Sequence, residues 1–432
     1  MELPHPPAAA TRAPAALPAR RWRVAQVLMV TLFVGYLDRM NISMALPLIA
    51  QQYGWSVAQT RELGGTLMTV FYVGYGLSNL FLSPLGVRFG PRASLLVVVS
   101  LWSLFTALGA VVSASLTALM VTRVLLGLSE GIHFPMMNLL TKRWFPPHER
   151  ARANSVWMGG LLAAVCLAPV MLVPLMHAWG WTGGFLILAA AGPLVSLPLV
   201  WWHVHDSPVR HPRIGADERD LIARGHAQEA ADTGLAPARL WHTMTRVPVL
   251  LMLAAGTLYN VVGVGLSLWL PTYFVTAKGL PYGDLVYATS LPYVMGVVGL
   301  VVWSVLGDRW NARAWLGGLG FMGGGVSIWL ALSLPGVAAS VACFTAAVFW
   351  MSAFSACEFS LVQRLLPPEQ VGACAGIYNG LVTMVGGGAG PLVVSAIIGS
   401  GPDGNPAGVL AAVAVCGLGA AVMGAVGWRL RY

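Results

Sequence analysis

Residues 93–113 read ASLLVVVSLWSLFTALGAVVS, and residues 116–140 read LTALMVTRVLLGLSEGIHFPMMNLL. A run of about 20 apolar residues has the length that an α-helix needs to cross the hydrocarbon core of a bilayer. Both runs are apolar on all sides, and each is about twice as long as a barrel strand of roughly 10 alternating residues. Because lipid offers no partner to backbone polar groups, such runs predict transmembrane helices.

Runs of this kind recur along the whole chain. Hydrophobic residues make up 57% of the sequence and charged residues only 9%, whereas a soluble domain carries about 25% charged residues. The composition predicts an all-α membrane protein. We expect twelve transmembrane helices, at residues 24–49, 63–86, 93–113, 116–140, 151–176, 182–204, 248–274, 285–307, 314–334, 337–362, 371–399 and 406–428.

The formal net charge of +9 follows the expected topology. When the loops are assigned alternately to two sides, most Lys and Arg residues fall on one side. The exceptions are Arg61 and Lys278 on the other side, and Arg39 and Arg123 within spans. The positive-inside rule then predicts an inner-membrane protein with both termini in the cytoplasm. The basic charge is therefore interpreted as a topology signal, and no nucleic-acid partner is expected.

One long polar stretch, residues 205–247, divides the chain. We expect a disordered cytoplasmic tail at 1–22, a six-helix bundle at 23–204, a cytoplasmic linker at 205–247 and a second six-helix bundle at 248–432. Within the linker, ADERDLIAR at 216–224 fits either a short amphipathic helix or a solvated segment.

The two halves match each other locally. RFGPRA at 88–93 resembles RWNARA at 309–314, and RWFPP at 143–147 resembles RLLPP at 364–368. Both pairs share one offset in residue number, which predicts a duplicated six-helix unit. Such repeats pack around a central site near the bilayer midplane.

The charged residues of these loops have two interpretations. Arg side chains at helix ends can cap exposed carbonyls and pair with acids of the neighbouring bundle, which would close a gate between the halves. Alternatively, they only set the topology. The residues concerned are Arg88, Arg92, Asp308, Arg309 and Arg313.

Several motifs resemble a known family. They are YLDRMNIS at 36–43, GLSEG at 127–131, RWFP at 143–146, DSP at 206–208 with HP at 211–212, and WLPTY at 269–273. With them the chain resembles the major facilitator superfamily after residue 20, and more narrowly the anion:cation symporter family of sugar-acid, hexuronate and phthalate permeases. One departure is Val87, which stands where the superfamily loop normally has Asp.

The resemblance implies the major facilitator fold, a monomer, and import of a small organic anion by proton symport with alternating access. The substrate would be a sugar acid or an aromatic carboxylate. Sodium coupling stays open, and the alternative is a proton-coupled efflux antiporter of drugs or metabolites. The sequence shows no metal-ligand spacing, nucleophile elbow or nucleotide-binding loop. We therefore expect no enzyme activity, cofactor or metal.

Five charged residues lie inside expected spans: Asp38, Arg39, Arg123, Glu130 and Glu358. A charge at the bilayer centre costs several kcal/mol, so such residues usually face a cavity on a transport pathway. Arg39 is the expected substrate anchor, because its planar fork can bind a carboxylate through two hydrogen bonds. The competing interpretation is an internal salt bridge with Asp38 or Glu130.

The acids of the first half are candidates for coupling. The resemblance implies Asp38 and Glu130 as proton-coupling residues. Glu130 follows Arg123 by seven residues, about 10 Å along one helix face, which leaves room for a third group between them. A purely structural charge network remains the alternative.

At the repeat offset, Asp38 and Arg39 correspond to Tyr259 and Asn260, so the second half offers neutral hydrogen-bonding groups. Glu358 has three open interpretations: pairing towards Arg364, a second proton site, or a substrate contact. The expected substrate-binding residues are Arg39, Tyr36, Tyr75, Arg123, Asn260, Tyr378, Asn379 and Glu358.

Overall fold

A computed structural model describes residues 20–232, 240–310, 312–366, 371–398 and 406–430. Within these ranges the chain is helical, and the expected tail at 1–22 lies largely outside them, with the first helix already begun at Arg20. The first half comprises α1 (Arg20–Tyr53), α2 (Val57–Leu77), η1 (Ser78–Leu82), α3 (Ser83–Phe89), α4 (Pro91–Val111), α5 (Leu116–Glu130), α6 (His133–Trp144), α7 (Pro147–Ala191), η2 (Gly192–Ser196) and α8 (Leu197–His203).

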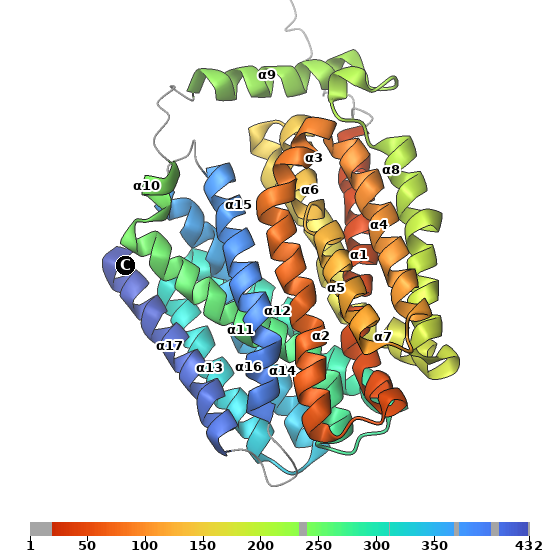
Figure 1. The fold of residues 1–432 in the computed structure, drawn as a ribbon. Helices are drawn as coiled ribbons and strands as arrows, with labels where there is room; N and C mark the ends of the chain where they lie inside the picture. The colour runs from red at the N-terminus through yellow and green to blue at the C-terminus, as the bar shows by residue number, and fades with distance from the viewer. Residues whose placement is uncertain (1–19, 233–239, 311, 367–370, 399–405, 431–432) are drawn as a thin grey trace, which may run out of the picture.

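The second half follows the same pattern of long helices, and a linker with shorter elements precedes it (Figure 1). The linker contains η3 (Pro208–Arg210), α9 (Ala216–Asp232) and α10 (Leu240–Met244). The second half comprises α11 (Val247–Thr276), η4 (Tyr282–Asp284), α12 (Leu285–Trp310), α13 (Arg313–Ser333), α14 (Val337–Leu365), α15 (Val371–Val382), η6 (Thr383–Gly387), α16 (Gly388–Ile398) and α17 (Pro406–Leu430).

Ten helices of the described chain are long and apolar enough to cross a membrane. The difference from the expected twelve arises at two places. The expected span 116–140 leaves the helix between Glu130 and His133, so α5 and α6 are each short. The expected spans 151–176 and 182–204 run together, because α7 continues past a single non-helical residue, Gly180, at φ 70° and ψ 167°.

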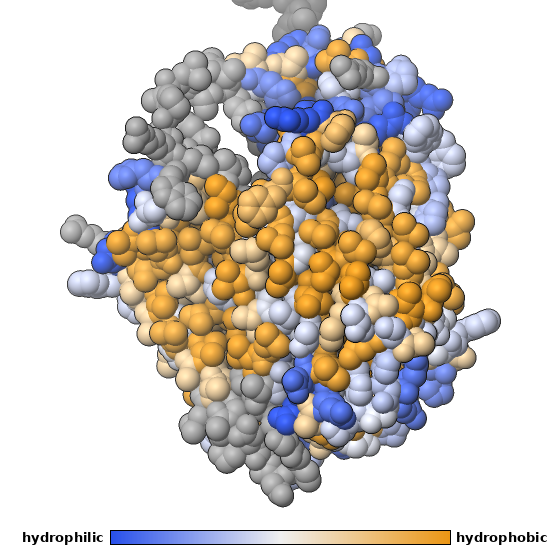
Figure 2. Space-filling model, in the orientation of Figure 1, coloured by the Kyte–Doolittle hydropathy of each residue, from blue (hydrophilic) through white to orange (hydrophobic). Residues whose placement is uncertain are grey.

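The molecular surface carries a broad apolar belt. Figure 2 shows hydrophobic residues around the middle of the visible face and hydrophilic residues towards both ends. Large apolar side chains on α4, α12 and α13 are exposed, including Val97, Val301 and Met322. An exposed apolar belt of this extent fits a lipid-facing surface.

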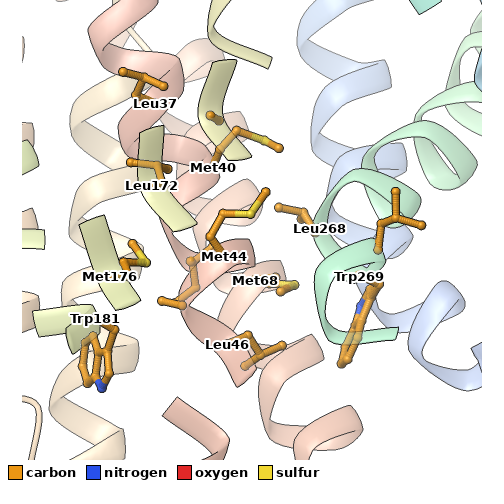
Figure 3. Packing of buried hydrophobic residues seen from close by; sticks show 14 of the residues in the cluster. Leu37, Met40, Met44, Leu46, Met68, Leu172, Met176, Trp181, Leu268 and Trp269 are labelled. Atoms are coloured by element: carbon orange, nitrogen blue, oxygen red, sulfur yellow. The ribbon is translucent and has the colours of Figure 1, made fainter. Parts of the chain in front are cut away.

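The buried apolar side chains form three clusters, and their distribution reveals how the halves meet. One cluster belongs to the first half and includes Leu28 and Trp144. A second belongs to the second half and includes Met252 and Phe354. The largest cluster joins both halves, and Figure 3 shows its side chains from α1, α7 and α11 facing one another, among them Met44, Met176 and Leu268.

Hydrogen bonds between the halves accompany this shared cluster. Ser43 Oγ donates to the Ser267 carbonyl at 3.1 Å, and Tyr282 Oη donates to the Met44 carbonyl at 2.9 Å. The residues involved are remote from the start of α1, which lies beside α9. These bonds join the halves in the part of the molecule away from α9, and the end opposite α9 is here called the distal end.

The expected amphipathic segment of the linker is helix α9, which lies across one end of the bundles (Figure 1). Arg21 of α1 fixes it there. The Arg21 guanidinium pairs with Glu218 of α9 at 2.9 Å and with Glu149 of α7 at 2.7 Å, and the Arg21 backbone N–H donates to Glu218 at 3.1 Å. Since Glu218 is only 2% exposed, this contact is shielded from solvent.

Glu218→Ala is expected to release α9 from the first half. The substitution leaves the Arg21 backbone N–H without its acceptor and removes one of two carboxylates from the guanidinium, a loss of about 1–3 kcal/mol. Trypsin should then cleave faster at Arg219 and Arg224, as followed by gel electrophoresis of the purified protein. Asp220→Ala, at an exposed position of the same helix, is the matched control. Equal cleavage rates in both variants would contradict the role of the Arg21–Glu218 contact in holding α9.

Candidate functional site

Close packing of α2 on α5 positions the acidic end of α5. Gly127 and Gly131 face the α2 backbone so closely that a Cβ on either would overlap the carbonyl oxygen of Phe71 or of Tyr75, respectively. Small residues at a helix interface allow such an approach in membranes. Glu130, between these glycines, is therefore held against α2 and is 2% exposed.

Arg39 of α1 forms a buried ion pair with Glu130. Its Nη2 lies 2.9 Å and its Nε 3.1 Å from the same carboxylate oxygen, Oε2. The guanidinium is 9% exposed. The sequence left open whether Arg39 pairs with Asp38 or with Glu130, and the structure shows the pair with Glu130.

Aromatic rings surround this guanidinium. The Arg39 Cζ lies 4.5 Å from the ring centres of Tyr36 and Tyr75, and 5.4 Å from that of Phe71. Stacking of this kind stabilises a weakly hydrated planar cation. The rings come from α1 and α2, the two helices of the first half that pack against α11 and α16 of the second half.

Asp38 takes part in a separate hydrogen-bonded chain. Its two carboxylate oxygens accept from Thr106 of α4 at 2.6 Å and from Asn41 Nδ2 at 2.9 Å, while Asn41 Oδ1 accepts from Arg123 at 3.1 Å. The Arg123 guanidinium also stacks on Phe185 at 4.9 Å. Neighbouring residues on α1 therefore serve two networks, because their side chains point about 100° apart around the helix.

Three buried polar atoms near this site have no hydrogen-bond partner among the described residues. They are Glu130 Oε1, His133 Nε2 and Ser78 Oγ. Ser78 opens the π-helical turn η1, and His133 begins α6 after the break in the fourth expected span. Irregular helical turns of this type often occur at functional sites. The second oxygen of Glu130 is accordingly available to carry a proton.

The second half contributes a more neutral set of side chains. Asn260 of α11 is half-buried and donates to the Gly256 carbonyl on its own helix at 3.1 Å. Tyr378 of α15 is buried and donates to Glu358 of α14 at 2.7 Å, and Asn379 is half-buried beside it. No group of three His, Cys, Asp or Glu in the described ranges could hold a metal ion.

The loop residues differ in their surroundings. The Arg92 guanidinium donates to the Trp201 carbonyl at 2.6 Å and its backbone N–H to Asp206 at 2.8 Å, both within the first half. Arg88 and Arg309 are exposed, and Arg313 is half-buried. The side chain of Asp308 lies outside the described residues. Arg92 thus caps a helix carbonyl in this conformation.

Sequence reasoning missed four side chains of the site: Thr106, Asn41, Phe71 and Phe185. Asn41 lies in the motif YLDRMNIS, but it carries no charge that would single it out beside Asp38 and Arg39. Thr106 is one of several hydroxyl residues in an otherwise apolar run, so the sequence carries no signal that selects it.

The sequence is similar to those of known transporters. The sequence model of the Major Facilitator Superfamily matches residues 28–391. The probable sulfoacetate transporter SauU of Cupriavidus necator is 30% identical over 291 residues, which cover 67% of this chain and 65% of that protein. The hexuronate transporter of Bacillus subtilis is 24% identical over 364 residues, which cover 82% of each chain.

Solved structures show the same fold. A bacterial homologue of the human lysosomal transporter Spinster, in an inward-facing and unoccupied conformation, superposes with a TM-score of 0.78 at 17% identity, covering 95% of this chain and 97% of that one. The long helices and the apolar belt agree with this likeness. Because the family match spans most of the sequence, the chain belongs to the Major Facilitator Superfamily.

Proposed function

We propose that the protein is a secondary transporter that imports a small organic anion, a sugar acid or an aromatic carboxylate, together with protons. The observation that carries the proposal is the buried Arg39–Glu130 pair. It offers a permanent cation, ringed by aromatic side chains, that is balanced by an acid able to exchange a proton. The names of the relatives, a sulfoacetate transporter and a hexuronate transporter, support an acidic substrate.

Anion binding and protonation are coupled through competition for Arg39. A substrate carboxylate or sulfonate takes the two donors that now hold Glu130 Oε2. Glu130, 2% exposed, would then be a buried carboxylate without its cation, which is costly in a low-dielectric site. A proton on Glu130 removes that cost. Substrate and proton therefore bind together, which is the requirement for symport.

Asp38 has a supporting or an additional coupling role in this proposal. Its contacts with Thr106, Asn41 and, through Asn41, Arg123 join α1 to α4 and α5. Loss of a proton or a change of partner at Asp38 would alter how α1 sits against those helices. In this proposal, the protonation state of Asp38 therefore affects the movement of the first half.

The distribution of contacts between the halves supports alternating access as part of this proposal. The shared apolar cluster and the Tyr282–Met44 hydrogen bond close the distal end. In this proposal α9 and both termini lie in the cytoplasm, as the positive-inside rule predicts. The conformation is then closed to the outside, and import requires a second state in which these distal contacts separate.

The substrate class is tested with proteoliposomes that contain a pH-sensitive dye. Sulfoacetate, D-glucuronate, D-glucarate and benzoate are added outside, beside neutral analogues of the same compounds. We expect at least one anion to acidify the lumen, because it enters together with protons. Acidification by none of them, with protein that elutes as a single species, would contradict proton symport, and uptake that follows a sodium gradient would replace it with sodium coupling.

Arg39→Lys is expected to raise the KM of the transported anion by about 10-fold or more, since Lys keeps the charge but loses the two-pronged hydrogen bond. Arg39→Ala should abolish uptake. Radiolabelled uptake into proteoliposomes measures both effects. Arg23→Ala, at an exposed Arg of the same helix, is the control and should leave the KM unchanged; an unaltered KM in Arg39→Lys would rule out substrate anchoring.

Glu130→Gln is expected to separate transport from the proton gradient. The amide keeps the shape of the side chain but cannot take up a proton, so uptake against a gradient should fail while exchange of labelled for unlabelled substrate continues. Counterflow and proton-driven uptake are compared in the same preparation. Glu62→Gln, at an exposed acid of α2, is the control. Gradient-driven accumulation at the native level in Glu130→Gln would contradict coupling at this residue.

A further inference from the structure

Glu358 is an acid buried in the apolar core of the second half. It lies on α14 about 10 Å from the helix end at Leu365, and it is 6% exposed. Among the described residues it forms no ion pair. Its helix neighbours Phe354, Cys357 and Leu361 belong to the apolar cluster of this half. An ionised carboxylate without a cation is unfavourable there, and a protonated one is much less so.

The hydroxyl of Tyr378 stands between Glu358 and a backbone acceptor. Tyr378 Oη lies 2.7 Å from Glu358 Oε1 and 3.2 Å from the carbonyl oxygen of Met252 on α11. Gly256, one turn after Met252, gives the hydroxyl its space, since a Cβ there would overlap it. Tyr378 itself is 1% exposed, so this geometry is sealed from bulk solvent.

This arrangement satisfies both protonation states of Glu358. When the acid is ionised, the single hydroxyl proton of Tyr378 is donated to Oε1. When the acid is protonated, its carboxyl proton can be donated to Tyr378 Oη, and the hydroxyl then turns to the Met252 carbonyl. In either state the Tyr378 proton has an acceptor, and so does the carboxyl proton when it is present, which is what a reversible proton site needs.

The charged and titratable residues around Glu358 do not suggest another role for this acid. Helices α11, α12, α13 and α15 pack against α14. Among the described residues, Tyr259 from α11 and Tyr378 from α15 are titratable groups that interact with Glu358. Arg309 of α12 and Arg313 of α13 form no ion pair with Glu358 in the described part of the chain, nor does Arg364 of α14 itself. The side chain of Asp308, on α12, lies outside the described residues.

We propose that Glu358 and Tyr378 form a second proton-binding site, in the half opposite to Glu130. When the site binds a proton, the hydrogen bond that Tyr378 donates moves from Glu358 on α14 to the Met252 carbonyl on α11. Helix α11 packs on α1, and α15 continues through η6, which contacts α2. Proton binding therefore changes a hydrogen bond that adjoins the interface between the halves. The coupling to transport rests on the proposed function, whereas the proton site itself does not.

Infrared difference spectra between acidic and alkaline buffer test the site without any substrate. The purified full-length protein in lipid should show the C=O stretch of a protonated buried carboxyl group. Glu358→Gln should remove this band, and Tyr378→Phe should shift it, because the carboxyl proton loses its acceptor. Glu62→Gln and Tyr287→Phe, at exposed positions of α2 and α12, are the matched controls. A spectrum of Glu358→Gln that equals the native one would overturn the proposal.

The contribution of Glu358 to transport is measured in proteoliposomes, with an anion that acidifies the lumen in the panel described above. The reversal potential of this anion gives the number of protons that accompany each substrate. Glu358→Gln should carry one proton fewer per substrate than the native protein. An unchanged proton count would overturn the coupling while leaving symport through Glu130 intact. Absence of proton movement in the native protein would instead contradict the proposed function. If Glu358→Gln does not fold, Tyr378→Phe decides, since it keeps the acid and must still shift the infrared band.

Discussion

The charge of Arg39 constrains the whole first half. A guanidinium stays ionised at any accessible pH, and this one is 9% exposed inside a helical bundle. It needs an anion at hydrogen-bonding distance, and Glu130 is that anion in the conformation described. The glycines of α5 bring Glu130 to α1 by letting α5 approach α2 closely. Helix packing here therefore brings the two charges together, and in the proposed mechanism a substrate anion would compete with Glu130 for the same donors.

Local properties of the sequence predicted the helices well, because length and hydropathy decide whether a segment spans a bilayer. The irregular points were not predicted. At the break between Glu130 and His133, Gly131 lies against the Tyr75 carbonyl of α2, a contact that only the tertiary structure reveals. Gly180 interrupts what is otherwise one helix through its own positive φ, with no other atom close to the position of a Cβ. The sequence left open whether residues 216–224 form an amphipathic helix or a solvated segment; they are helical, and Arg21 pairs with this helix through Glu218.

The site residues show a similar division. Charge inside an apolar segment identified Asp38, Arg39, Arg123, Glu130 and Glu358 as unusual, but it did not give their partners. Partners depend on the rotation of each helix: Asp38 faces Thr106 on α4, while Arg39, one residue later, faces Glu130 on α5. Neutral partners such as Thr106 and Phe185 carry no signal, since an apolar helix contains many residues like them.

The asymmetry between the halves has a physical consequence. Around Arg39, stacked rings and a paired acid hold a permanent charge, so binding there changes by exchange of anions. Around Glu358 no ion pair is formed by the described residues, and the hydroxyl of Tyr378 reaches acceptors on two helices, so that site changes by gain or loss of a proton. The two proposed sites thus differ in chemistry. Each one adjoins a helix at the interface between the halves, so in the proposed mechanism the proton and the anion would act on the same movement from opposite sides.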